Sequence, residues 1–177
     1  MKYVILACAL ALMSALPAAA QMVETSVKAS NGVSVSVNTD EFAGRYEYAS
    51  PKIDLVDGYA LVAAVKTGTA DTGVIVMGGF VYSGDWRFYD SAVFRGGAEA
   101  EYLEAGRTVG RCSASRYSNG CTLNEGFRVV LTPEQIQQYG NDGVVAVQIR
   151  SRRTTNVAML QIPIAYLDAV REVSARH

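Results

Sequence analysis

Two apolar segments decide the fold: GYALVAAVKT at residues 58–67 and GVIVMGGFVY at residues 73–82. Both are continuously apolar and do not alternate, which is typical of β-strands that are covered on both faces. Gly78 and Gly79 interrupt the second segment and predict a bulge or a close approach of another backbone. The centre of the protein is therefore expected to be a β-sheet.

The rest of the chain is punctuated by Gly, Asn, Asp and Ser, as in an all-β protein. Residues 33–37 alternate strictly, and residues 144–150 place Val145, Val147 and Ile149 on one face. Further strands are predicted at 107–112 and 121–131, which pair with each other, and at 156–162. Eight or nine such strands predict an antiparallel β-sandwich of immunoglobulin-like architecture, with a closed barrel as the alternative.

A tight turn at residues 83–85 predicts that residues 86–95 return as a partner strand. Alternation along that strand buries Trp86 on the same face as Phe88, Ala92 and Phe94. Asp90 falls on this apolar face, which indicates either a bulge or a buried carboxylate with a partner.

Two helices are predicted near the C-terminus. Thr132, Pro133 and Gln135 form a capping-box signature, and Gly140 ends that helix after about two turns. From residue 163 the apolar period becomes helical, with Ile164, Leu167, Val170 and Val173 on one stripe. The segment 98–105 fits a short helix by composition and a strand by position, and both remain open.

The first twenty residues predict a secretory signal peptide. Lys2 precedes an apolar stretch over residues 3–13, and the small-residue run ending at Ala20 predicts cleavage after that residue. A signal anchor, or a lipid on Cys8, is the alternative. Residues 21–177 then form a single β-rich domain of suitable size for one core.

Charge and composition exclude several partners. The chain has 16 basic and 17 acidic residues, and loss of Lys2 leaves a net charge of about −2. No basic excess is available for nucleic acid or an anionic membrane surface. No stretch after the signal peptide has transmembrane length. The expected product is a soluble exported protein, periplasmic or secreted.

Cys112 and Cys121 are the two cysteines of the mature chain, and they predict a disulfide. An exported compartment is oxidising, and the eight-residue gap is too long for redox or zinc motifs. The closed loop bears Arg116 and Tyr117, which makes it a candidate binding loop. The alternative is a hairpin end that needs restraint, with Asn119-Gly120 as its turn.

The sequence does not contain the side chains that most common catalytic mechanisms require. His177 is the one histidine, so a serine or cysteine triad is not expected, and neither a metal site nor a cofactor is predicted. What remains is carboxylate chemistry of the glycosidase type close to Trp86. The candidate acids are Asp85, Asp90, Glu99, Glu101 and Glu104.

A second candidate binding element is the run Arg150-Ser151-Arg152-Arg153. Three arginines at a hairpin end suit bidentate binding of an anionic group. The alternative is a solvated turn whose charges blunt an edge strand.

The stretch GDWRFYDSAVFRGG, followed by the cysteine pair and a PxxYLxAV-like ending, resembles small exported β-rich proteins of unknown function from Gram-negative bacteria. The resemblance covers about residues 84–170 and implies no activity. We therefore expect a non-enzymatic domain that binds or assembles envelope components, with an envelope protein or a glycan as partner. A carboxylate-based glycan-acting enzyme and a small outer-membrane barrel are the alternatives, and the charged terminal helix disfavours the barrel.

Overall fold

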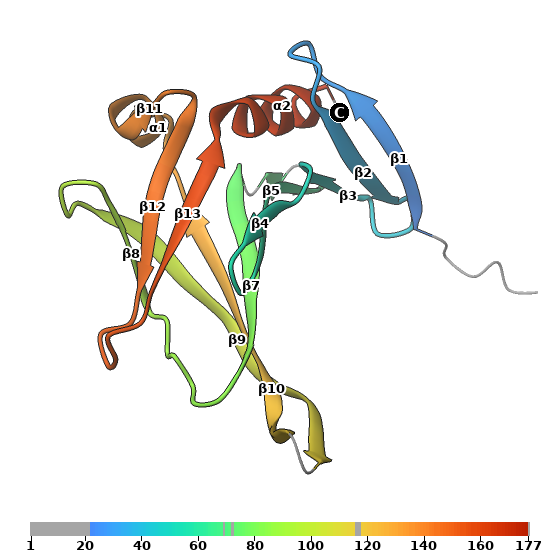
Figure 1. Ribbon diagram of the computed structural model, residues 1–177. Helices are drawn as coiled ribbons and strands as arrows, with labels where there is room; N and C mark the ends of the chain where they lie inside the picture. The colour runs from blue at the N-terminus through green and yellow to red at the C-terminus, as the bar shows by residue number, and fades with distance from the viewer. Residues whose placement is uncertain (1–21, 69, 72, 116–117, 177) are drawn as a thin grey trace, which may run out of the picture.

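The computed structural model describes residues 22–68, 70–71, 73–115 and 118–176. The predicted signal peptide lies outside these residues. The fold is mainly antiparallel β-structure with two helices, as the sequence predicts (Figure 1). The strands are β1 (Val23–Lys28), β2 (Ser34–Asp40), β3 (Arg45–Ala49), β4 (Ile53–Leu55), β5 (Gly58–Thr67), β6 (Ala70–Asp71), β7 (Ile75–Ser83), β8 (Ser91–Phe94), β9 (Glu99–Ser115), β10 (Ser118–Val130), β11 (Gly140–Asn141), β12 (Val144–Arg150) and β13 (Val157–Pro163). The helices are α1 (Pro133–Tyr139) and α2 (Ile164–Ser174).

The described strands form one open sheet whose main path runs β1-β2-β3-β5-β7-β10-β9-β8-β12-β11. Strand β9 lies inside this path and joins its two halves. Its first two residues pair with β8, and the remainder pairs with β10. We call strands β1–β7, strand β10 and the long part of β9 the large half-sheet, and strands β8, β11, β12 and β13 the small half-sheet. Because β9 joins the halves without a break, an immunoglobulin-like sandwich of two separate sheets is not confirmed.

The core lies between the two half-sheets and under helix α2. In Figure 1, α2 runs across the top of the molecule from the end of β13 toward β2, and it contacts β5, β2, β3 and β13. Of the predicted stripe, Leu167, Val170 and Val173 are fully buried there and Ile164 is half-buried. The alternating residues Val35 and Val37 of β2, and Val145 and Val147 of β12, are also buried. Burial of each such side chain stabilises the fold by about 1.5–3 kcal/mol. The predicted amphipathic patterns of these elements are confirmed.

Helix α1 begins and ends where the sequence predicts. The amide of Gln135 donates to the Thr132 hydroxyl at 3.2 Å, and the Gln135 side chain accepts from the Thr132 amide at 3.0 Å. Pro133 opens the helix and Gly140 caps its end. The capping box therefore fixes this two-turn helix from local sequence alone.

The predicted strand at residues 86–95 is wrong over most of its length. Only β8 is a strand, and it pairs with β9 and β12 instead of returning along β7. Residues 84–90 form a loop, in which Trp86 is half-buried and Phe88 has a left-handed backbone with φ of 56°. Asp90 has a partner, since it accepts from the Arg152 amide at 3.0 Å. Residues 99–105 of the ambiguous segment 98–105 belong to strand β9, so the strand alternative is confirmed.

Strands β5 and β7 are covered on one face and not on both, which corrects the interpretation of their apolar sequences. Val62, Val76 and Phe80 lie in the core, whereas the side chains between them point to the opposite surface, where most are only half-buried. The close approach predicted for the double glycine is confirmed at Gly78. A Cβ atom there would lie 2.2 Å from the Tyr59 carbonyl oxygen.

Candidate functional site

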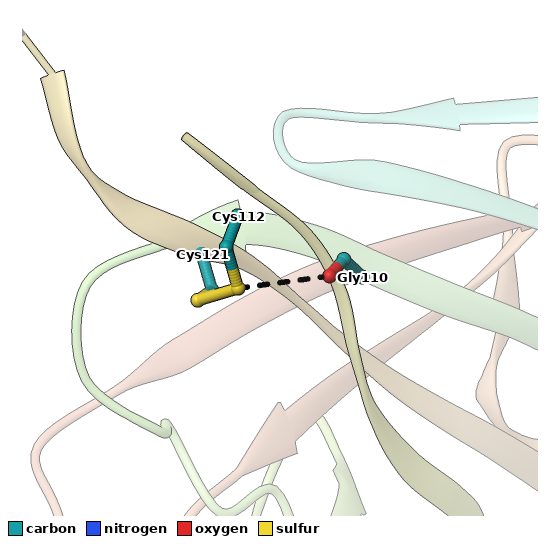
Figure 2. Close-up of a disulfide and its surroundings, with 3 residues drawn as sticks. All are labelled: Gly110, Cys112 and Cys121. Atoms are coloured by element: carbon teal, nitrogen blue, oxygen red, sulfur yellow. Dashed lines mark hydrogen bonds between the residues drawn. A yellow bond between two sulfur atoms is a disulfide. The ribbon is translucent and has the colours of Figure 1, made fainter. Parts of the chain in front are cut away.

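The predicted disulfide joins Cys112 and Cys121, which are direct partners across β9 and β10 (Figure 2). The dashed contact from the Cys112 sulfur to the Gly110 oxygen measures 3.9 Å. A disulfide sulfur carries no proton, so this is a packing contact. Asn119 and Gly120 lie within β10, where they pair with Ala114 and Ser113 of β9, so the turn predicted at these two residues is wrong.

The disulfide holds a two-stranded ribbon that projects beyond the sheet. Strand β7 stops pairing with β10 at Thr122, so beyond that point residues 112–115 and 118–121 pair only with each other among the described residues (Figure 1). A two-stranded ribbon is marginally stable by itself, which gives the cross-link a structural role. The candidate residues Arg116 and Tyr117 lie outside the described residues, so their role as a binding loop stays a prediction.

The second predicted element, the arginine run that begins at the last residue of β12, packs against the 84–90 loop. Arg152 lies 3.4 Å from Glu99, and the Arg150 side chain donates to Gln148. The Arg153 guanidinium lies 5.4 Å from the centre of the Phe88 ring. These contacts join the hairpin end to its neighbours, and the guanidinium of Arg152 already has a carboxylate partner. The run therefore offers less free positive charge than its sequence indicates.

The five candidate acids are not brought together. Glu99 pairs with Arg152, Glu104 pairs with Arg107 at 2.6 Å, and Asp90 caps a backbone amide. Asp85 and Glu101 are exposed on the surface. None of the five lines either of the two hollows that are described below. The arrangement gives no facing carboxyl pair of the kind that glycosidases use.

One carboxylate that the sequence did not single out is buried at the centre of the large half-sheet. Glu125 on β10 is 2% exposed. It accepts from the backbone amides of Arg87, Phe88 and Tyr89 at 2.9–3.0 Å, from Arg107 Nε at 3.1 Å and from the Tyr82 hydroxyl. The positive φ of Phe88 turns three successive amides toward one anion, which is a backbone nest. We call these groups the Glu125 clamp.

The hydrogen bonds of the clamp keep Glu125 ionised and Tyr82 protonated. Burial of Glu125 acts to raise its pKa, but hydrogen bonds from Tyr82, Arg107 and the loop amides of Phe88 and Tyr89 hold the pKa below its ordinary value. Burial and the bond to Glu125 raise the pKa of Tyr82 to about 12, so its hydroxyl stays a donor. With five donors on one ionised carboxylate, the clamp has no free group for a substrate. It fixes the 84–90 loop to the sheet.

The opposite face of the same strands carries a different feature, an open groove of about 450 Å³. Most of the residues that line it face outward from β2, β3, β5, β7 and β10, and the core residues Tyr48 and Ala64 complete its lining. We call it the outer groove. Its apolar side chains are Ala49, Leu61, Ala63, Val65, Ile75 and Met77, and its polar ones are Asn38, Arg45, Glu47 and Arg128.

Strand register explains why the groove is continuous. Ala49, Ala63 and Ile75 face one another across three neighbouring strands, and Leu61 and Met77 form the next row. Small alanines along the first row leave a depression between larger neighbours. Just beyond it lie the exposed side chains of Tyr59, Val81 and Leu103. A continuous exposed apolar face that spans several strands is typical of a binding site.

The two arginines of the outer groove differ in whether they have an acidic partner. Arg45 is neutralised by Glu47 at 2.6 Å. Arg128 is exposed between Met77 and Leu103, its direct partners on β7 and β9. None of the ion pairs among the described residues involves Arg128. The groove therefore presents one uncompensated positive charge beside an apolar surface.

A second hollow, of about 570 Å³, lies where the end of α2 meets the start of α1. It is lined by Lys66, Asp71, Thr132 and Arg171, among others. Lys66 pairs with Asp71 at 3.8 Å, and Arg171 pairs with Asp168 at 3.3 Å. Because its cations already have acidic partners, this hollow is a weaker candidate than the outer groove.

Comparison with known proteins finds no family model, no curated protein and no solved structure that matches this chain. Within the part of the chain that the structure describes, no helix is long and apolar enough to cross a membrane. The same residues contain no cluster of three or more potential metal ligands.

Sequence reasoning missed the outer groove although its signal was present. The continuous apolar runs of β5 and β7 were attributed to coverage on both faces. The same pattern arises when one face packs in the core and the other is a binding surface. Only the placement of α2 on one side distinguishes the two cases.

Proposed function

We propose that this chain is a non-enzymatic binding domain, exported to the periplasm or secreted, that acts in binding or assembly of envelope components. The outer groove is the binding surface. The observation that carries the proposal is an apolar groove of about 450 Å³ on the face opposite the core. That volume lies within the usual range for small-ligand sites, roughly 300–1,000 Å³.

A further observation supports a binding role. The five candidate acids are dispersed and three of them have partners, so they form no carboxyl pair for catalysis.

The disulfide supports export. The Cys112–Cys121 bond is what an oxidising compartment produces. Export itself is tested by the intact mass of protein isolated from a bacterial periplasm. The expected chain starts at Gln21, and a chain that retains Lys2 contradicts the proposal.

The binding proposal is tested with an environment-sensitive apolar dye, 1-anilinonaphthalene-8-sulfonate. Ala63 forms the groove floor and is 5% exposed although its side chain faces outward. Ala63→Trp fills the groove, so dye fluorescence should fall at least fivefold from that of the wild type. The matched control is Ala146→Trp on the outer face of β12, which should keep the wild-type signal. Equal signals from all three proteins contradict the proposal.

A further inference from the structure

We infer that the ligand of the outer groove is a single-chain anionic amphiphile, an acyl chain with a carboxylate head that Arg128 binds. This inference rests on the proposed function and names the chemistry of its ligand. Three properties of the groove lead to it: its hydrogen-bonding capacity, its size and its charge.

Hydrogen bonding excludes an extended peptide. Strands β5 and β7 form the middle of the groove, and each pairs with neighbours on both edges. Their amides and carbonyls are used within the sheet. A peptide strand needs a free strand edge for its own amides, and buried amides without partners are costly. The occupant must therefore have few polar groups along its length, or satisfy them internally as a helix does.

Size favours an acyl chain over a helix. A helix with its side chains is about 10–12 Å across, whereas neighbouring strands are only about 4.8 Å apart, so a helix spans more than two of them. The groove follows rows of side chains across the strands. Ala49 and Ala63 form its floor, and the larger side chains of Val65, Ile75 and Leu61 surround them. A narrow, flexible hydrocarbon chain fits such a trough, and Met77 can adapt its side chain to it.

Charge selects the head group. Arg128 is the groove cation without an ion-pair partner among the described residues, and it lies beside Met77 at the β10 side of the trough. Arg45 is held by Glu47 at the opposite side. A guanidinium binds a carboxylate through two parallel hydrogen bonds. An acyl chain on the alanine floor therefore places its carboxylate at Arg128.

The test compares two ligands with the same tail and opposite charge, dodecanoate and dodecyltrimethylammonium, each below its micelle concentration at pH 7.5. Isothermal titration calorimetry with the mature protein should show dodecanoate binding at least tenfold more tightly. Arg128→Gln should weaken dodecanoate binding about tenfold and leave dodecyltrimethylammonium unaffected. Arg111→Gln, an exposed arginine of β9 outside the groove, is the matched control and should behave as the wild type.

The other outcomes separate this inference from the proposed function. Equal affinities for the two ligands, both lost in Ala63→Trp, contradict the anionic head but retain the groove as a binding surface. An unchanged preference in Arg128→Gln contradicts the role of that residue. Binding that survives Ala63→Trp, or no binding of either ligand, contradicts both proposals. Sedimentation velocity provides the last arm: a dimer that Ala63→Trp abolishes assigns the groove to a second copy and overturns the ligand.

Discussion

Glu125 and Arg128 lie three residues apart on β10, yet they face opposite sides of the sheet. They differ in burial and in the number of partners that their charges have. Glu125 points inward, is almost fully buried and accepts hydrogen bonds from five donors. Arg128 points outward, is exposed among apolar side chains and takes part in none of the ion pairs among the described residues. A buried charge with every hydrogen bond made fixes its partners in place and is costly to disrupt, whereas an exposed charge on an apolar face is available to a ligand.

The largest effect is expected from Glu125→Gln. The substitution leaves Arg107 without its buried partner and gives the loop amides a weaker acceptor. Breaking a buried pair in this way costs about 3–5 kcal/mol of unfolding free energy. Urea denaturation measures it. Glu104→Gln is the control, because Glu104 is a half-exposed partner of the same Arg107 and should cost under about 1 kcal/mol. Equal costs contradict the clamp.

Removal of the disulfide is expected to cost less. A Cys112→Ser/Cys121→Ser double variant should lose roughly 2–3 kcal/mol of stability in the chain-entropy model. Its dodecanoate affinity should equal that of the wild type, because the ribbon lies outside the groove. Thiol titration of the denatured, unreduced wild type checks the bond, and two free thiols contradict it. Weakened dodecanoate binding in the double variant would instead link the ribbon to the site.

Substitution of two adjacent glycines of β7 compares how tightly the inner and outer faces of the sheet are packed. A Cβ atom at Gly78 points into the core, 2.2 Å from the Tyr59 oxygen and 2.8 Å from the Phe127 ring. At Gly79 it points outward, and its nearest neighbour is the backbone carbonyl oxygen of Glu125 at 3.7 Å. Gly78→Ala should therefore cost about 1–3 kcal/mol, and Gly79→Ala should be neutral within about 1 kcal/mol. Thermal unfolding of the pair measures the contrast, and similar melting temperatures contradict it.

Acid should destabilise the protein through Glu125. The folded state holds the pKa of this carboxyl below its ordinary value, which is about 4.3 in unfolded chains. Its contribution is therefore complete above that value and is lost as the pH falls through the lower folded pKa. Unfolding free energies measured from pH 6 to pH 3 should decline less steeply in Glu125→Gln than in the wild type. Parallel curves for the two proteins contradict this assignment.

The smallest effect on stability is expected in the outer groove. Met77 is half-buried on the outer face, so Met77→Gln should cost under about 1 kcal/mol. The same change places an amide on the apolar trough and should weaken dodecanoate binding by about tenfold. Denaturation and calorimetry on one preparation measure both quantities. A large loss of stability with unchanged binding would make this face part of the fold and not a site.

Local signals in the sequence predicted local structure well. The capping box at Thr132, the stripe from Leu167 to Val173 and the alternation of β12 each depend on residues close in sequence, and all three are confirmed. The disulfide was also predictable, since two cysteines in an exported chain have one simple outcome.

Long-range pairing was less predictable. The 84–90 loop leaves the expected hairpin because Glu125, some forty residues later, binds its amides, and no local pattern at residues 86–95 reports that contact. The outer groove depends on which face of β5 receives α2. An apolar run identifies a buried face but does not say whether the second face is covered by the protein itself or by a ligand.

The methionines provide the most direct test of the outer groove. Residues 22–176 contain three of them: Met77 in the groove, Met159 on β13 and Met22 before β1. In protein labelled with ¹³C at the methionine methyls, addition of dodecanoate should shift the Met77 signal and leave those of Met22 and Met159 in place. A Met159 or Met22 shift with an unmoved Met77 signal would contradict the groove as the binding surface.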